Sequence, residues 1–156
     1  MRRHPHVALR AAVAALLVLA QTGLALAETH EVRMLNKGPG GQRNVFDPPV
    51  IQVRPGDTVR FVPVDRGHNS ASIDDMLPAG ASGWRGDVGR PVEVTFEVEG
   101  AYGYRCEPHF GFGMVGLVLV GNAGEGLAAV RGATPRGPAG RAFETLFSEA
   151  EALSAR

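Results

Sequence analysis

Residues 92–99 alternate apolar and polar side chains without interruption, as Val-Glu-Val-Thr-Phe-Glu-Val-Glu. A period of two places the apolar side chains on one face of a β-strand and the polar ones on the other. The segment therefore predicts a strand with one face on a core and one in water. Gly100-Ala101 then predicts a turn, and residues 102–106 the returning strand, with Tyr102, Tyr104 and Cys106 on one face.

Other short apolar segments are bounded by turn residues in the same way. Strands are expected at residues 29–35, 50–54, 58–64 and 115–120, with a Pro-Gly-Asp turn between the second and third. Short strands at this spacing predict an all-β fold, a sandwich of two sheets. Residues 67–88 are irregular and predict a long connection with at most one helical turn.

Residues 122–156 have a different pattern, which predicts two helices. Leu127 and Val130 indicate a short helix, and a Thr-Pro-Arg-Gly-Pro stretch separates it from a longer amphipathic one. The tail is too small to fold alone, so we expect it to pack on the sandwich within one domain of residues 28–156. The apolar stripe of the longer helix consists of Phe143, Leu146, Phe147, Ala150 and Leu153.

Residues 1–27 have the pattern of a secretory signal peptide. Three arginines precede an unbroken apolar run at residues 11–20, and Ala25-Leu26-Ala27 offers a small-x-small cleavage site before Glu28. A membrane anchor is the alternative, but a spanning helix needs about 18 or more apolar residues. We therefore predict export to the periplasm, with no membrane attachment after cleavage.

The charge of the predicted mature chain is mildly negative. Three of the 16 Lys and Arg residues lie in the leader and none of the 16 Asp and Glu residues do, which leaves a net charge of −3. Nucleic-acid binding relies on a positive surplus, so this composition argues against a nucleic-acid partner.

Cys106 is the single cysteine of the chain. In an exported protein a lone thiol is liable to oxidation unless it is buried, paired between chains or bound to a metal. The residues after it form the pattern Cys106-x2-His109-x4-Met114 between two predicted strands. A thiolate and two imidazoles with a weak axial thioether are the ligands of blue copper electron-transfer sites. His68, which follows the strand at 58–64, is the candidate second histidine.

Each of these residues also has an ordinary interpretation. A buried cysteine often acts as a small hydrophobic side chain, and Met114 could fill the core. Zinc accepts two histidines and one cysteine, but methionine is a soft ligand that suits copper better. A nucleophilic Cys106–His109 pair would need an orienting third group, which the sequence does not offer. His30 is expected to be solvated, and Trp84 to lie in the core or an interface.

Several segments resemble the pseudoazurins, a family of periplasmic cupredoxins. The similar segments are residues 34–38, 55–59, 63–69 and 100–114. The resemblance implies a cupredoxin-like Greek-key β-sandwich and a one-electron carrier rather than an enzyme, with one copper cycling between Cu(I) and Cu(II). It implies His68, Cys106, His109 and Met114 as ligands, with Asn69 and Pro108 supporting them. It further implies a monomer that exchanges electrons with nitrite reductase, nitrous oxide reductase, c-type cytochromes or an acceptor of the cytochrome peroxidase type.

Glu107 departs from the family, which typically has a neutral residue between the cysteine and the histidine. Its negative charge close to the metal is expected to favour Cu(II) and to lower the reduction potential slightly.

A docking surface is expected around the ring of His109, which we predict to be the electron port. A positive rim on a net-negative protein would steer an acidic partner, an effect that salt weakens. A copper-delivery protein is the alternative function, but the chain lacks clusters rich in Met and His. The apolar residues of the patch are Pro63, Pro108, Phe110 and Phe112, and its rim consists of Lys37, Arg66 and Arg105.

Overall fold

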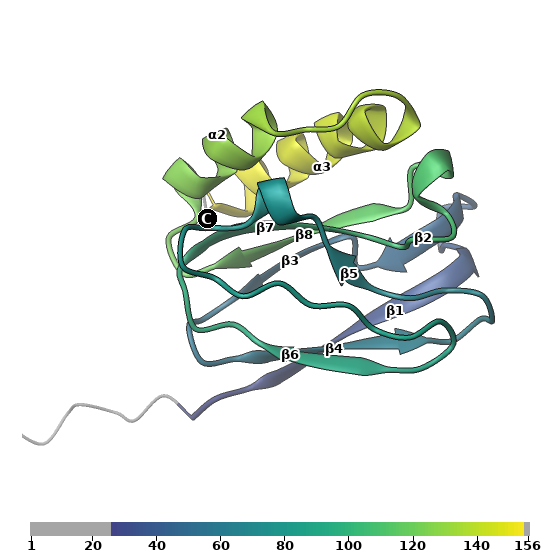
Figure 1. Cartoon of the computed structure of the whole chain (residues 1–156), viewed down its shortest axis with the longest axis horizontal. Helices are drawn as coiled ribbons and strands as arrows, with labels where there is room; N and C mark the ends of the chain where they lie inside the picture. The colour runs from purple at the N-terminus through teal and green to yellow at the C-terminus, as the bar shows by residue number, and fades with distance from the viewer. Residues whose placement is uncertain (1–25, 155–156) are drawn as a thin grey trace, which may run out of the picture.

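A computed structural model describes residues 26–154, so the predicted signal peptide lies almost wholly outside the described residues. Two four-stranded sheets face each other in this part of the chain (Figure 1). The first has the order β2-β1-β4-β6, with β1 at Thr29–Lys37, β2 at Arg43–Asp47, β4 at Thr58–Pro63 and β6 at Val92–Thr95. The second has the order β3-β8-β7-β5, with β3 at Val50–Val53, β5 at Ala71–Ser72, β7 at Gly100–Arg105 and β8 at Val115–Val120.

The strand order confirms the predicted Greek-key sandwich. β1 pairs in parallel with β4, and β3 in parallel with β8, while the remaining pairs are antiparallel. A parallel pair cannot be joined by a tight hairpin, so the chain crosses between the two sheets instead. These crossings bring the C-terminal ends of β4 and β7, which are far apart in sequence, to the same end of the sandwich.

The inward faces of the two sheets form one apolar core. Tyr102, Tyr104 and Cys106 all lie in it, which confirms that they share a face of the returning strand. Trp84 packs on the same core, with its ring 5.7 Å from that of Phe61 between centroids. The other buried members are Val32, Met34, Phe46, Val53, Val59, Phe96, Met114, Val118 and Val120.

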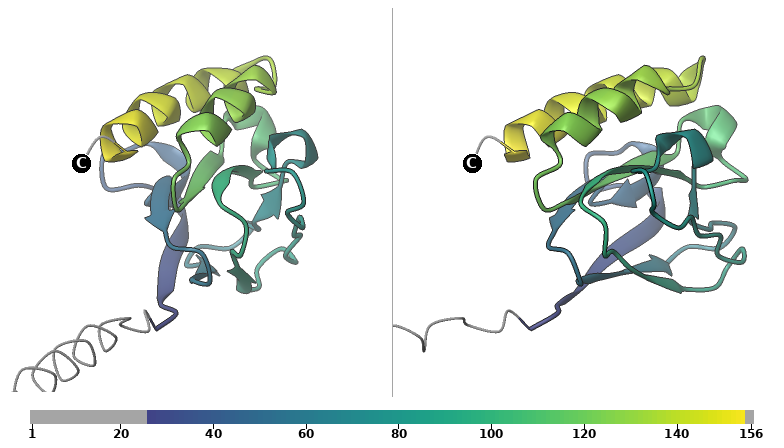
Figure 2. Two further views of the ribbon diagram at one scale, coloured as in Figure 1. Left: turned by 90° about the vertical axis from the view of Figure 1, so that its left-hand side faces the viewer. Right: turned by 60° about the vertical axis from the view of Figure 1, so that its left-hand side comes forward.

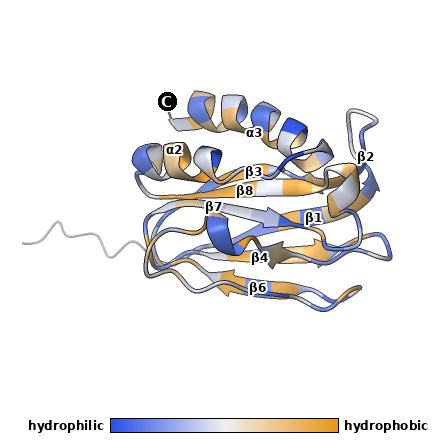
Figure 3. Cartoon of the chain, turned by 45° about the horizontal axis from the view of Figure 1, so that its top comes forward, coloured by the Kyte–Doolittle hydropathy of each residue, from blue (hydrophilic) through white to orange (hydrophobic). Residues whose placement is uncertain are grey.

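Two helices cover the outer face of the second sheet and form a third layer (Figure 2). α2 spans Gly124–Gly132 and packs on β7, while α3 spans Pro138–Ser154 and packs on β8 and β3. A second apolar core lies between the helices and this sheet, and the predicted stripe of α3 faces it, with Leu153 partly buried at its end. Because both faces of β8 are covered, all six of its residues are buried, and the strand is mostly hydrophobic in Figure 3. Among the described residues no helix is long and apolar enough to cross a membrane.

Several boundaries differ from the sequence-based expectation. The strand predicted for residues 92–99 ends at Thr95, because Thr95 pairs with Thr58, the first residue of β4. Beyond it the Phe96 N–H donates to the carbonyl oxygen of Asp57, outside the ladder. β2 was not predicted because Arg-Asn-Val-Phe-Asp does not alternate apolar and polar residues, and β5 because two residues are too few to establish a period. The connection at 67–88 contains β5 and one 3-10 turn, η1, at Asp74–Met76.

The expectation that His30 is solvated was wrong. Its ring is partly buried, and Nε2 lies 3.2 Å from Oδ2 of Asp57, whose carboxylate is almost fully buried. The parallel pairing of β1 with β4 sets His30 beside the turn that carries Asp57. That contact depends on strand pairing, which the local sequence around His30 does not reveal.

Candidate metal centre

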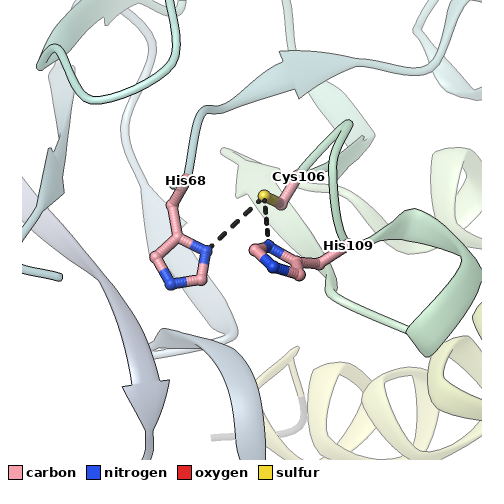
Figure 4. A group of neighbouring side chains, drawn as sticks. All are labelled: His68, Cys106 and His109. Atoms are coloured by element: carbon pink, nitrogen blue, oxygen red, sulfur yellow. Dashed lines mark hydrogen bonds between the residues drawn. The ribbon is translucent and has the colours of Figure 1, made fainter. Parts of the chain in front are cut away.

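Three of the predicted ligands converge from two separate loops. His68 follows β4, Cys106 follows β7, and His109 precedes η2, a 3-10 turn at Phe110–Phe112. Their donor atoms all lie within 4.8 Å of one another. Figure 4 shows the two imidazole rings directed at the sulfur atom from different sides.

The distances between the donor atoms fit one shared metal ion. Nδ1 of His68 lies 3.7 Å from Sγ of Cys106, and Nδ1 of His109 lies 3.4 Å from the same sulfur. Metal bonds of about 2.0 Å to nitrogen and about 2.3 Å to sulfur, at an angle of about 120°, place the two donors about 3.7 Å apart. The residues present therefore fit a trigonal site with two nitrogen ligands and one sulfur ligand.

The ring of His68 is set up to bind through Nδ1. It is fully buried, and its Nε2 lies 2.9 Å from Oδ1 of Asn36. An amide oxygen can only accept, so Nε2 carries the proton and Nδ1 presents its lone pair to the site. Burial, and then the neighbouring ring of His109, lower the pKa of His68. The imidazole thus stays neutral, the form in which histidine binds a metal.

Cys106 is a free thiol with no exposed surface. Burial raises its pKa, and hydrogen bonds involving the backbone of Asn69 and His109 oppose that shift. The thiol therefore stays protonated on its own, whereas a bound metal deprotonates a coordinating thiol. Burial and metal binding would both protect this single cysteine from oxidation.

The backbone of the ligand loop closes on itself and fixes Met114. The Cys106 N–H donates to the Met114 carbonyl oxygen at 3.0 Å, and the Met114 N–H donates to that of His109 at 3.2 Å. Gly113 has a φ of 89°, a left-handed conformation that glycine adopts readily, and this lets the chain turn from η2 into β8. The Met114 side chain is 1 % exposed and belongs to the same core as Cys106. Its role as axial ligand stays a prediction.

Asn69 connects the two ligand-bearing loops. Its Oδ1 accepts from the Glu107 N–H at 2.8 Å, and its Nδ2 donates both to the Gly86 carbonyl oxygen at 2.9 Å and to Oε2 of Glu107 at 2.8 Å. The predicted supporting residue Pro108 lies exposed in the same loop.

The residues of the predicted docking surface differ widely in exposure. Phe112 is 76 % exposed, and its ring centroid lies 6.4 Å from that of His109. Arg105 lies over the ring of Phe110 at 5.3 Å, a cation–π contact. Lys37 and Arg66 are exposed, whereas Pro63 and Phe110 are partly buried. That these residues receive a partner stays a prediction.

Two functional contacts were missed from the sequence. Asn36 was part of a segment used for the family resemblance, but nothing local indicated that it faces His68. Arg85 lies in the irregular 67–88 connection, yet its Nε contacts both carboxylate oxygens of Glu107, at 3.1 and 2.9 Å. The negative charge of Glu107, expected to lie close to the metal, is therefore paired with a positive side chain.

Comparison with known proteins, like the geometry of the site, indicates a copper-binding protein. Residues 32–121 match the family model described as copper binding proteins of the plastocyanin/azurin family. Pseudoazurin of Paracoccus pantotrophus is 47 % identical over 126 residues, which cover 81 % of this chain and 85 % of that protein. Pseudoazurin of Methylorubrum extorquens is 39 % identical over 91 % of this chain and 95 % of its own length. The solved pseudoazurin structure from Sinorhizobium meliltoi has a TM-score of 0.76 at 43 % identity, over 80 % of this chain and 97 % of that one.

Proposed function

Because this chain belongs to the plastocyanin/azurin family of copper-binding proteins, and within it to the pseudoazurins, we propose that it carries single electrons between proteins of the periplasm. It is a copper electron carrier and not an enzyme. The observation that carries the proposal is the cluster of His68, Cys106 and His109, whose donor atoms lie within 4.8 Å of one another in a largely buried position.

We assign one type 1 copper to this cluster. Nδ1 of His68, Sγ of Cys106 and Nδ1 of His109 are the three strong ligands, and the thioether of Met114 is the weak axial one. The thioether of Met114 favours copper over zinc, because zinc also accepts thiolate and imidazole ligands, whereas a weak axial thioether is typical of type 1 copper. The burial of Met114 next to the ligand loop supports its axial assignment.

The bound copper supplies the one-electron chemistry, and the protein keeps the ligands in place in both oxidation states. Two features of the chain support such rigidity. The ligand loop is closed by its own backbone hydrogen bonds, and Asn69 ties it to the loop that carries His68. A site that changes little on gaining an electron transfers that electron with little reorganisation.

We place the protein in the periplasm, with residues 1–27 removed as a signal peptide. The charged start, the apolar run and the Ala-Leu-Ala site support this assignment. The mature protein would then be the single domain of residues 28–156.

We propose that electrons pass through the ring edge of His109, which is only partly buried. The exposed ring of Phe112 beside it, and the nearby positive side chains, support docking of an acidic redox protein at this end of the molecule. The candidate partners are nitrite reductase, nitrous oxide reductase and c-type cytochromes, and we expect the carrier to be a monomer.

Addition of Cu(II) to the purified copper-free protein tests the proposal. An intense blue or green colour at one copper per chain, bleached by ascorbate and restored by an oxidant, is the expected result. Colourless binding of copper would contradict a type 1 site. Colour that does not bleach reversibly would instead favour a protein that stores or delivers copper.

A further inference from the structure

The carboxylate of Glu107 lies at the centre of a group of polar contacts next to Cys106. Its two oxygens accept from Nε of Arg85 at 3.1 and 2.9 Å, and Oε2 also accepts from Nδ2 of Asn69 at 2.8 Å. A terminal guanidinium nitrogen of Arg105 lies 3.9 Å from Oε1. The Glu107 side chain is 26 % exposed, so part of its charge has left water and depends on these partners.

The same contacts join three separate segments of the chain. Asn69 binds the Glu107 backbone N–H through Oδ1 and the Gly86 carbonyl oxygen through Nδ2. The Gly86 N–H in turn donates to the carbonyl oxygen of Ser70 at 2.8 Å. The segment of residues 85–86 is thereby fastened to both ligand-bearing loops, one at Asn69 beside His68 and the other at Glu107 beside Cys106.

We propose that Arg85 is a positioning residue for the copper site. Arg85, Asn69 and Glu107 form a clamp, in which Arg85 holds the Glu107 carboxylate where it can accept from Asn69. Asn69 is then fixed between the two loops, and with it the spacing of His68 and Cys106. Neither Arg85 nor Glu107 is an assigned ligand, and both act through Asn69 on the loops that carry His68 and Cys106.

The physical need for Arg85 follows from the charge of its partner. A carboxylate that has partly left water needs hydrogen-bond donors from the protein, and without Arg85 its side chain would turn outward toward water. If the Glu107 carboxylate moved away, one N–H of the buried Asn69 amide would have no acceptor.

Arg85 is 76 % exposed, and an exposed ion pair contributes little by itself. Its contact is nevertheless short, with Nε 2.9 Å from Oε2, and the charged acceptor is partly buried. We therefore expect an effect on copper retention of about threefold, which corresponds to the upper part of the range for surface pairs.

The proposal rests on the proposed copper site, and a double-mutant cycle tests it. Arg85→Gln, Glu107→Gln and the double variant are compared with Arg90→Gln, which removes an equal charge from an exposed position in the same loop. For each protein we would measure the rate of copper loss to a chelator, the absorption spectrum and the thermal unfolding of the copper-free form.

Arg85→Gln is expected to lose copper about threefold faster than the wild type, to change the ratio of its absorption bands and to unfold at a lower temperature without copper. Arg90→Gln should match the wild type in all three. In the Glu107→Gln background the change at Arg85 should have little further effect, because its partner is already gone. Equal behaviour of Arg85→Gln and Arg90→Gln, or an undiminished effect of Arg85→Gln in that background, would overturn the clamp. Failure of the wild type to form the coloured copper complex would instead refute the proposed function, and the unfolding of the copper-free variants would still decide on the clamp.

Discussion

Nε2 of His68 lies 2.9 Å from Oδ1 of Asn36, a residue near the end of β1. The contact decides which nitrogen of the buried ring carries its proton. It also fixes the rotation of the ring about the Cβ–Cγ bond of His68. A partner of this kind orients a ligand histidine and raises its basicity.

Replacement of Asn36 by alanine is expected to weaken copper binding about tenfold or more, since the ring of His68 loses the acceptor that fixes its tautomer. Competition with a chelator of known affinity measures the change. Asn122→Ala is the matched control, because Asn122 is exposed and lies after β8. Equal copper affinity of the two variants would show that Asn36 does not orient the ligand.

Replacement of Met114 by alanine should change the reduction potential and the absorption spectrum while copper stays bound, since an axial thioether is a weak ligand. Met114→Leu separates loss of the sulfur from loss of volume at this buried position. Both variants should change the spectrum, and only alanine should strongly lower stability. Complete loss of copper from the leucine variant, or a spectrum identical to that of the wild type, would rule out the axial role.

Asp57 should stabilise the fold above acidic pH. Hydrogen bonds from the backbone N–H groups of Arg54 and Glu28 hold its pKa well below the ordinary value, with smaller contributions from His30 and the Arg54 side chain. A carboxyl group with a depressed folded-state pKa contributes stability above its unfolded pKa of about 3.9, and this is lost as pH falls toward the folded value.

Urea unfolding of copper-free wild type and Asp57→Asn from pH 7 to pH 3 should therefore give a difference in free energy that is constant near neutrality and narrows below about pH 4. Asp74→Asn, at an exposed position in η1, should show no such difference. If the difference in free energy of unfolding between wild type and Asp57→Asn increased as the pH fell, the predicted role of Asp57 would be contradicted.

The double variant Lys37→Gln/Arg66→Gln should slow electron transfer to nitrite reductase at low salt, and the difference from the wild type should disappear at high ionic strength. Stopped-flow rates at several salt concentrations measure it. Arg141→Gln removes an exposed charge on α3 and serves as the control. Rates that respond equally to both sets of substitutions would show no local docking effect.

Phe147→Ala is expected to lower the free energy of unfolding by about 3–5 kcal/mol, because the ring is fully buried on the inner face of α3 and stacks near Phe143. Phe112→Ala, on an exposed ring, should change stability by no more than about 0.5 kcal/mol. Chemical denaturation of both variants compares them. A small effect at Phe147 would mean that the helical tail unfolds separately from the sandwich.

Much of the fold could be predicted because its patterns are local. The alternating residues from Val92 onward and the apolar stripe of the last helix each indicate one face that must be buried. The structure has a strand, β6, at the first position and a helix, α3, at the second. β5 could not be predicted, since Ala71 and Ser72 form a strand only through pairing with Arg105 and Tyr104 of β7. The true end of β6 likewise depends on the length of β4.

The donor types of Cys106, His109 and Met114 in one loop, taken together with His68, indicated copper, because a thioether suits copper better than zinc. Only the tertiary structure decided that His68 meets Cys106 and His109, that Asn36 orients its ring, and that Arg85 pairs with Glu107. Each of those contacts joins residues from different strands or loops. Their proximity follows from the order in which the strands pair, and no short stretch of sequence carries that information.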